Sequence, residues 1–128
     1  MDKSILVEKN IEEGKYLVEA LDRSKFNVEG ALWYYYLKYN EWRLLLASPL
    51  VDEIGPKKSY NIVFSVIQDL NLSSISIMDI SVLSPKHRLI KLLKIALKTG
   101  PKDISKIRFT GNTINNEFIA DALIYRLS

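Results

Sequence analysis

The sequence predicts an α+β fold: a single domain over residues 1–128, with about five strands in a mixed or antiparallel sheet and helices packed mainly on one face. Three observations support this prediction. Apolar residues recur at helical spacing in three stretches, and runs rich in aromatic and β-branched residues lie between and after them. The resulting element order is α-β-β-α-β-α-β-β. No linker or repeat interrupts this order, so we expect one domain.

The first element predicted is a helix over residues 4–23. An apolar stripe at helical spacing lies opposite acids and lysines, and its members are Val7, Ile11, Leu17, Val18 and Leu21. Gly14 lies in the middle of this stretch. A glycine there costs about 1 kcal/mol relative to alanine, so it weakens the helix signal.

Residues 28–49 carry the clearest strand signal, because aromatic residues that favour a pleated surface dominate the first half. Asn40 and Glu41 are suited to a turn before the second run at 42–47. The cross-strand pairs that this predicts are Tyr39 with Trp42, Leu37 with Leu44, and Tyr35 with Leu46. Both faces of these strands are apolar, so we expect them at the centre of the sheet.

The middle of the chain predicts a loop, a helix and a strand. Residues 50–55 form the loop, and Pro56 suits the first position of a helix over about residues 57–71 because its missing N–H costs nothing there. A third strand is expected at residues 77–83, where apolar and polar side chains alternate.

The last part of the chain predicts a third helix over residues 85–99. Ser84 is the expected N-cap, and Gly100 followed by Pro101 ends the helix. Two strands at residues 105–109 and 118–127 then form a second hairpin. Residues 110–117, TGNTINNE, are expected as the loop between them.

The composition excludes several classes of site. The 128 residues are 48% hydrophobic and 26% charged, which is typical of a globular protein and too apolar for a disordered one. Cysteine is absent, which excludes a disulfide, a thiolate nucleophile and a cysteine metal site. The longest apolar run, residues 31–37, is too short to span a membrane, and the N-terminal residues do not resemble a signal peptide. We therefore expect a cytoplasmic protein without membrane contact.

Residues 84–102, SPKHRLIKLLKIALKTGPK, concentrate the positive charge of the chain. They hold six Lys or Arg residues, the only histidine and no acid, whereas the rest of the chain has 12 basic and 15 acidic residues, a balance of −3. The net charge of +3 is therefore local. The candidate anion- or nucleic-acid-binding residues are Lys86, His87, Arg88, Lys91, Lys94 and Lys98.

On a helical wheel the basic residues of this stretch form a narrow stripe opposite an apolar face. His87, Lys91, Lys94 and Lys98 share an arc of about 60°. The first turn adds free N–H groups and the positive end of the helix dipole, which suit a phosphate or carboxylate. Lysines are point charges that suit a phosphate backbone and do not read bases. The simpler interpretation is the solvated face of an ordinary packed helix.

Catalytic patterns are sparse. A single histidine excludes a metal site of several histidines, and no common nucleophile, zinc or phosphate-loop motif occurs. Asp79 and Asp121 each interrupt an apolar strand, and with Asp52 and Glu53 they are the carboxylates that could meet as a magnesium or acid–base site. Solvent-facing strand positions explain them more simply. No cofactor is predicted.

The aromatic block at residues 33–42, WYYYLKYNEW, has two interpretations. On an open sheet face it would form a platform for stacking nucleic-acid bases. Tryptophan and tyrosine on central strands are more often part of the core, and no glycine-aromatic RNA-binding motif accompanies them. We therefore expect these residues in the core.

Four segments resemble a family of small uncharacterised bacterial proteins. They are ALWYYY (31–36), NEWRLLLASPLVDEIGPKKSY (40–60), DISVLSPKHRLIKLL (79–93) and IRF (107–109). The resemblance covers most of the chain and implies a bacterial or mobile-element origin. It supplies no activity and no functional residues.

The sequence thus predicts a binding or accessory module without catalysis of its own. Its expected partner is another protein or a second copy of itself, as in a homo-oligomer. Binding of nucleic-acid backbone through the basic helix at 85–99 is the alternative. A small metal-dependent enzyme using Asp79 and Asp121 is the third hypothesis.

Overall fold

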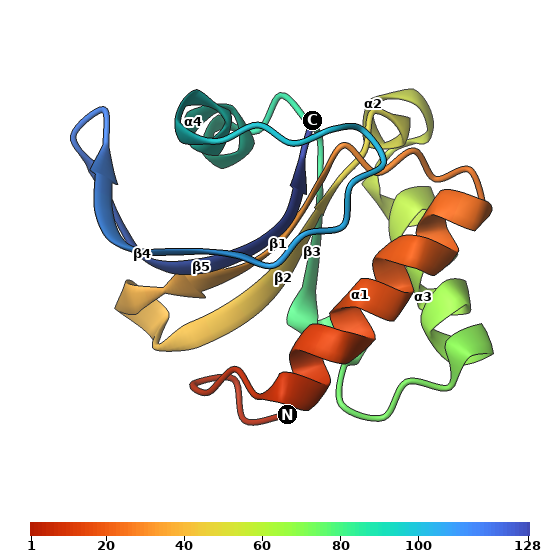
Figure 1. The fold of residues 1–128 in the computed structure, drawn as a ribbon. Coiled ribbons are helices and arrows are strands. Elements are labelled where there is room, and N and C mark those ends of the chain that lie inside the picture. The colour runs from red at the N-terminus through yellow and green to blue at the C-terminus, as the bar shows by residue number, and fades with distance from the viewer.

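The computed structural model describes residues 1–128 and contains one five-stranded sheet with four α-helices (Figure 1). The strands are β1 (Gly30–Tyr36), β2 (Glu41–Ala47), β3 (Ile80–Leu83), β4 (Ile107–Ile114) and β5 (Glu117–Leu127). The α-helices are α1 (Glu8–Arg23), α2 (Leu50–Ile54), α3 (Pro56–Leu70) and α4 (Arg88–Ala96), and two 3-10 helices are η1 (Leu37–Tyr39) and η2 (Ile77–Asp79). The predicted α+β class and element order are confirmed.

The sheet is mixed, with the strand order β3-β2-β1-β5-β4. β2 and β3 run parallel because α2 and α3 connect them, and every other neighbouring pair is antiparallel. β1 is the central strand, as its apolar composition predicts. No helix in the structure is long and apolar enough to cross a membrane.

Helices cover both faces of the sheet, although most lie on one. Figure 1 shows α1 and α3 on one side and α4 on the concave side, enclosed by the curve of the sheet. The larger core packs α1 and α3 against side chains such as Trp33 and Leu44. The smaller core packs α4 against the alternate residues of the same strands, such as Leu32 and Leu45. This two-sided cover explains why the central strands read as almost continuous apolar runs.

The predicted register of the first hairpin is wrong by four positions. Tyr35 lies opposite Trp42, and Trp33 lies opposite Leu44. The cause is the connection, in which residues 37–39 form η1 and Asn40 takes a left-handed conformation with φ of 50°. The chain therefore needs four residues for the turn instead of two. A shift of an even number keeps the same residues together on each face of the hairpin. Leu37 and Tyr39, however, were expected in the core and instead lie exposed in the turn.

A bulge in β5 directs two consecutive side chains towards α1. The pairing of β1 with β5 shifts between Ala31 and Leu32, which leaves Tyr125 as the extra residue. The Tyr125 hydroxyl donates a hydrogen bond to the carbonyl of Ile11 at 2.6 Å. Next to it, the buried guanidinium of Arg126 makes two hydrogen bonds of 2.8 Å to the Asp22 carboxylate. These contacts fix α1 on the sheet.

Several predicted boundaries are wrong, each for a local reason. The first helix begins at Glu8 instead of residue 4, because the segment before it lies along β2, where the Trp42 amide donates to the Lys3 carbonyl at 2.6 Å. Part of the expected 50–55 loop is the helix α2, whose Leu50 amide donates to Ser48 Oγ at 3.1 Å. Within the predicted strand at 77–83, the first three residues form η2 instead.

The second hairpin is longer than predicted. The expected loop at 110–117 is mostly strand, because β4 continues to Ile114 and only Asn115 and Asn116 form the turn. Both asparagines have positive φ, as a tight two-residue turn requires. Gly111, with φ of 60°, accommodates an irregularity in the middle of β4. The strand signal was missed here because the residues involved are polar and exposed.

Candidate functional site

The basic stretch at 84–102 does not form one continuous helix. Helix α4 begins at Arg88, and His87 is its N-cap, with Nδ1 accepting a 3.1 Å hydrogen bond from the Leu89 amide. Ser84, the predicted cap, instead donates to Asp52 Oδ2 at 2.8 Å. The helix ends at Ala96, and Leu97 is extended, with φ of −151°. The predicted extent of 85–99 is therefore wrong at both ends, and Lys98 lies outside the helix and its stripe.

Most cations in and just before α4 have no acidic partner. Lys86 and Lys91 are exposed and Lys94 is half-buried, and none of these lysines forms an ion pair. Arg88 is the exception, because it is hydrogen-bonded and ion-paired to Glu117 at the tip of the β4–β5 hairpin. This hydrogen bond and the charge of Glu117 raise the pKa of Arg88. The arginine thus contributes to joining α4 to the hairpin, and the lysines remain available.

Lys98 and Lys102 gather with cations from another part of the chain. They line two adjoining hollows together with Arg23 at the end of α1 and Lys25 in the loop that follows. We call these two hollows and their four cations the basic hollow. Sequence reasoning missed Arg23 and Lys25 because they are more than 70 residues away from Lys98. The sequence around Arg23 and Lys25 does not indicate a binding site, because both residues look like ordinary surface cations.

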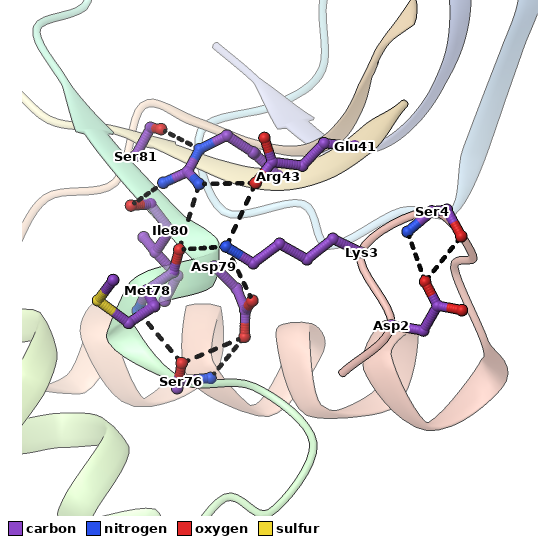
Figure 2. Close-up of polar contacts among 10 residues, drawn as sticks. All are labelled: Asp2, Lys3, Ser4, Glu41, Arg43, Ser76, Met78, Asp79, Ile80 and Ser81. Carbon is purple, nitrogen blue, oxygen red and sulfur yellow. Dashed lines mark hydrogen bonds and ion pairs between the residues drawn. The ribbon is translucent and has the colours of Figure 1, made fainter. Parts of the chain in front are cut away.

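Asp79 is held in a network of structural contacts, which Figure 2 shows. Its side chain is almost fully buried and accepts a 2.8 Å hydrogen bond from the Ser76 amide, which closes η2. Lys3 lies 4.0 Å from Asp79 and 3.2 Å from Glu41. Arg43 completes the network, donating to Ser81 Oγ and to the Ile80 carbonyl at 2.8 Å each. Asp79 thus holds the turn before β3 in place.

Asp121 forms its own ion pair on a different strand. Arg108 donates two hydrogen bonds of 2.6 Å to it, and Thr110 Oγ1 donates a third of 2.9 Å. Burial alone would raise the pKa of Asp121, but the hydrogen bonds from Arg108 and Thr110 outweigh it and lower the pKa. The carboxylate is therefore held in its charged form.

The predicted carboxylate site is not assembled. Asp79 precedes the edge strand β3, whereas Asp121 lies on β5, and β2 and β1 lie between them. Three strand spacings correspond to about 14 Å. Asp52 and Glu53 lie on α2, and Asp52 accepts a hydrogen bond from Ser84. No group of three or more His, Cys, Asp or Glu side chains could hold a metal ion. The structure therefore offers no joint site for the metal-dependent hypothesis.

The tryptophans of the aromatic block belong to the core, as expected. Trp33 is fully buried, and its Nε1 donates to the Tyr125 hydroxyl at 2.9 Å. Trp42 is 5% exposed, packs against Tyr35 with ring centroids 5.3 Å apart, and has the Arg108 guanidinium 5.6 Å from its ring. Neither indole presents a free face for a nucleic-acid base. The tyrosines at the end of β1 are only half-buried.

Two hairpins diverge at the end of β1 and leave an apolar hollow. Pairing between β1 and β5 stops at Tyr34 and Ala122, although β5 extends to Glu117 on its other side with β4. In Figure 1 the tip of the β4–β5 hairpin bends towards α4, away from the β1–β2 turn. The hollow between them has a volume of about 150 Å³. Its lining, apolar except for Lys38, consists of Tyr34, Tyr35, Tyr36, Leu37, Lys38, Phe118 and Ala120.

Large apolar side chains stand exposed around this hollow. Leu37 is 63% exposed, Phe118 is 57% exposed, and Tyr39 in the same turn as Leu37 is 65% exposed. Tyr34 and Tyr36 pack edge to face beside them, with ring centroids 4.8 Å apart. We call Tyr34, Tyr36, Leu37, Tyr39 and Phe118 the hairpin-end patch. Exposed apolar residues gathered in one place are typical of a protein interaction surface.

Comparisons with known proteins match no family model, no curated protein and no solved structure. The resemblance to small bacterial proteins therefore stays a prediction.

Proposed function

We propose that the protein is a non-catalytic binding module that acts through protein–protein contacts at the hairpin-end patch, and that its first partner is a second copy of the same chain. One observation carries this proposal. The patch contains exposed apolar side chains and an apolar hollow that can receive one. A surface with both features can pair with its own copy when a two-fold axis places an apolar side chain of each chain in the hollow of the other.

The chemistry of the hairpin-end patch supports such an interface. Aromatic side chains are enriched at the centre of protein interfaces, where they lose water on association. Leu37 and Phe118 lie on different hairpins at the rim of the hollow, so a side chain inserted between them would contact both. The patch has five residues, whereas a standard interface has about 20–30 residues a side, so we expect a dimer with a dissociation constant in the micromolar range or weaker.

Sedimentation velocity over a wide range of concentrations tests the dimer. We expect wild-type protein to dimerise with increasing concentration, and the variants Leu37→Ser and Phe118→Ser to stay monomeric. Ile95→Ser is the matched control, because Ile95 is 62% exposed on α4 and does not line the hollow. Wild-type protein that stays monomeric at the highest concentration, or patch variants that dimerise like the control, would contradict the proposal.

Binding of nucleic-acid backbone by α4 is a second candidate, favoured by the absence of acidic partners for Lys86, Lys91 and Lys94. Such binding would weaken steeply with salt, because phosphate contacts release counterions. Fluorescence anisotropy with a labelled oligonucleotide tests it. Replacing Lys91 and Lys94 with glutamate should abolish binding, and an unchanged affinity would exclude this surface.

A further inference from the structure

We propose that the basic hollow is a binding site for a short chain of phosphate groups. The site lies where three segments meet: the end of α1, the loop after it, and the segment between α4 and β4. Its two parts have volumes of about 460 and 440 Å³ and share Asn27, Val28 and Pro101 as lining residues. Because they share these residues, the two parts form one continuous recess, and each part falls within the size range of ligand sites.

The charges around the basic hollow are unbalanced. Arg23, Lys25, Lys98 and Lys102 line it, and none of them forms an ion pair. The lining contains two acidic side chains, Asp22 and Glu29, and both oxygens of Asp22 are already bonded to Arg126. Four cations that face one recess repel each other unless an anion lies between them. A multiply charged anion would relieve this repulsion.

A buried arginine beneath the basic hollow holds its walls together. The Arg126 guanidinium, 1% exposed, binds Asp22 at the end of α1, the Val28 carbonyl at 3.0 Å and the Asp103 carbonyl at 2.9 Å. One side chain therefore connects all three segments. Thr99 adds a second link, because its amide donates to the Leu127 carbonyl at 2.7 Å. A wall fixed in this way loses little conformational freedom when a ligand binds.

The lining of the basic hollow selects the class of ligand. Only one lining residue in each part is hydrophobic and none is aromatic, so the recess contains no aromatic side chain on which a nucleobase could stack. Lysine and arginine bind phosphate oxygens through charge-assisted hydrogen bonds. Cations spread over two adjoining hollows suit several phosphates in a row better than one. Inorganic tripolyphosphate has this chemistry and serves as the probe.

Isothermal titration calorimetry with tripolyphosphate at low salt tests the site. We expect one ligand per chain and weaker binding as salt rises. The triple variant Arg23→Gln, Lys25→Gln, Lys102→Gln should bind at least about tenfold more weakly, because it loses several charge-assisted contacts. All three positions are exposed, so we expect the variant to fold, and its thermal unfolding is measured alongside.

Two controls separate this site from a general effect of charge. Lys9→Gln, Lys38→Gln, Lys57→Gln removes the same charge at exposed positions outside the basic hollow and should stay within about twofold of wild type. The variant Lys86→Gln, Lys91→Gln, Lys94→Gln removes the three unpaired lysines in and just before α4 and should do the same. The proposal is wrong if tripolyphosphate does not bind at low salt, if the hollow variant binds like wild type, or if the α4 variant is the one that loses binding.

The source of the phosphate chain is distinguished by a second ligand. An oligothymidylate titrated into the same variants reports whether a nucleic-acid backbone occupies the recess. If its affinity also depends on the hollow cations, nucleic acid is the source, and if only tripolyphosphate shows this dependence, the source is a free phosphate chain. In either case the amide resonances of residues 23–28, 98–100 and 102 should shift on binding, and shifts confined to α4 would overturn the assignment.

Discussion

Gly14 illustrates how tertiary contacts reverse a residue-level expectation. In the sequence it looks like a defect in a helix, since alanine is favoured there by about 1 kcal/mol. In the structure the Tyr125 hydroxyl lies against it, and a Cβ at Gly14 would be 2.4 Å from that oxygen and 3.0 Å from Trp33 Nε1. Glycine therefore allows β5 to approach α1 closely. Burial, the largest influence, raises the pKa of Tyr125, so the hydroxyl stays protonated as a hydrogen-bond donor.

The substitution Gly14→Ala should destabilise the protein despite the better helix propensity of alanine. Overpacking against a buried side chain costs typically about 1–3 kcal/mol. We expect a net loss of about 1 kcal/mol or more in the free energy of unfolding after the gain in propensity. Urea denaturation monitored by tryptophan fluorescence measures it.

The double variant Gly14→Ala, Tyr125→Phe is the control for the origin of this loss. Tyr125→Phe removes the oxygen that an alanine methyl group would meet, together with its bonds to Trp33 and Ile11. The two effects should therefore be less than additive in a double-mutant cycle. Strictly additive losses, or a stabilised Gly14→Ala variant, would show that contact with the Tyr125 hydroxyl is not the cause of the loss in stability.

At the scale of elements, Glu13 on α1 binds the segment that follows α3 and so holds that segment against α1. Its nearly buried carboxylate accepts hydrogen bonds from the amide and hydroxyl of Ser74, at 2.8 Å each, and from those of Ser73 at 3.2 and 3.3 Å. Burial alone would raise the pKa of Glu13, but the bonds from Ser74 and Ser73 together outweigh it and lower the pKa. The carboxylate is thus bound in its charged form.

Acid should therefore weaken the contact between α1 and this segment. Because the pKa of Glu13 is lower in the folded than in the unfolded chain, its contribution is present above the unfolded value and is lost as pH falls through the folded value. We expect Glu13→Gln to lose about 2 kcal/mol at pH 7, since an amide nitrogen cannot accept these bonds. The difference from wild type should shrink between about pH 5 and pH 3. Urea denaturation at both ends of this range measures it, and a constant difference would contradict the assignment.

The length of α4 shows the same competition between local and tertiary effects. Its apolar periodicity continues through Leu97, and Gly100 followed by Pro101 predicts the end of the helix there. The chain leaves the helix earlier because Thr99 pairs with the last residue of β5, and its Oγ1 accepts a 3.0 Å hydrogen bond from the Leu127 amide. An extended chain is needed for that pairing. Because α4 ends early, Lys98 lies at the basic hollow instead of on the stripe of α4.

At the scale of the whole molecule, the two candidate surfaces are independent. The hairpin-end patch and the basic hollow have no residue in common. Substitutions in one should leave the other unchanged, so the dimer and the phosphate site are separately testable. A dimer through the hairpin ends would leave the four cations of the basic hollow accessible.

The fold was largely predictable because it follows from local patterns. Helical stripes, aromatic strand runs and turn residues indicated the type and order of all eight predicted elements. The ends were wrong for the helices at 4–23 and 85–99 and for the strands at 77–83 and 105–109. The candidate site was only partly predictable. The basic stretch contributed Lys98 and Lys102, but Arg23 and Lys25 join them only through the packing of α1 beside the segment after α4. The predicted carboxylate site was wrong because a polar residue between apolar neighbours does not indicate which strands are adjacent in the sheet.

Local periodicity and composition thus decided the class of fold and the order of its elements, because these depend on neighbours along the chain. Strand order, the hairpin register, the bulge at Tyr125 and the end of α4 depend on contacts between residues far apart in sequence. These contacts depend on packing throughout the core. No single segment determines them, because each one supplies only one side of the contact. The surfaces for which we propose functions arise from these long-range contacts: a cleft between diverging hairpins, and cations from two ends of the chain in one recess.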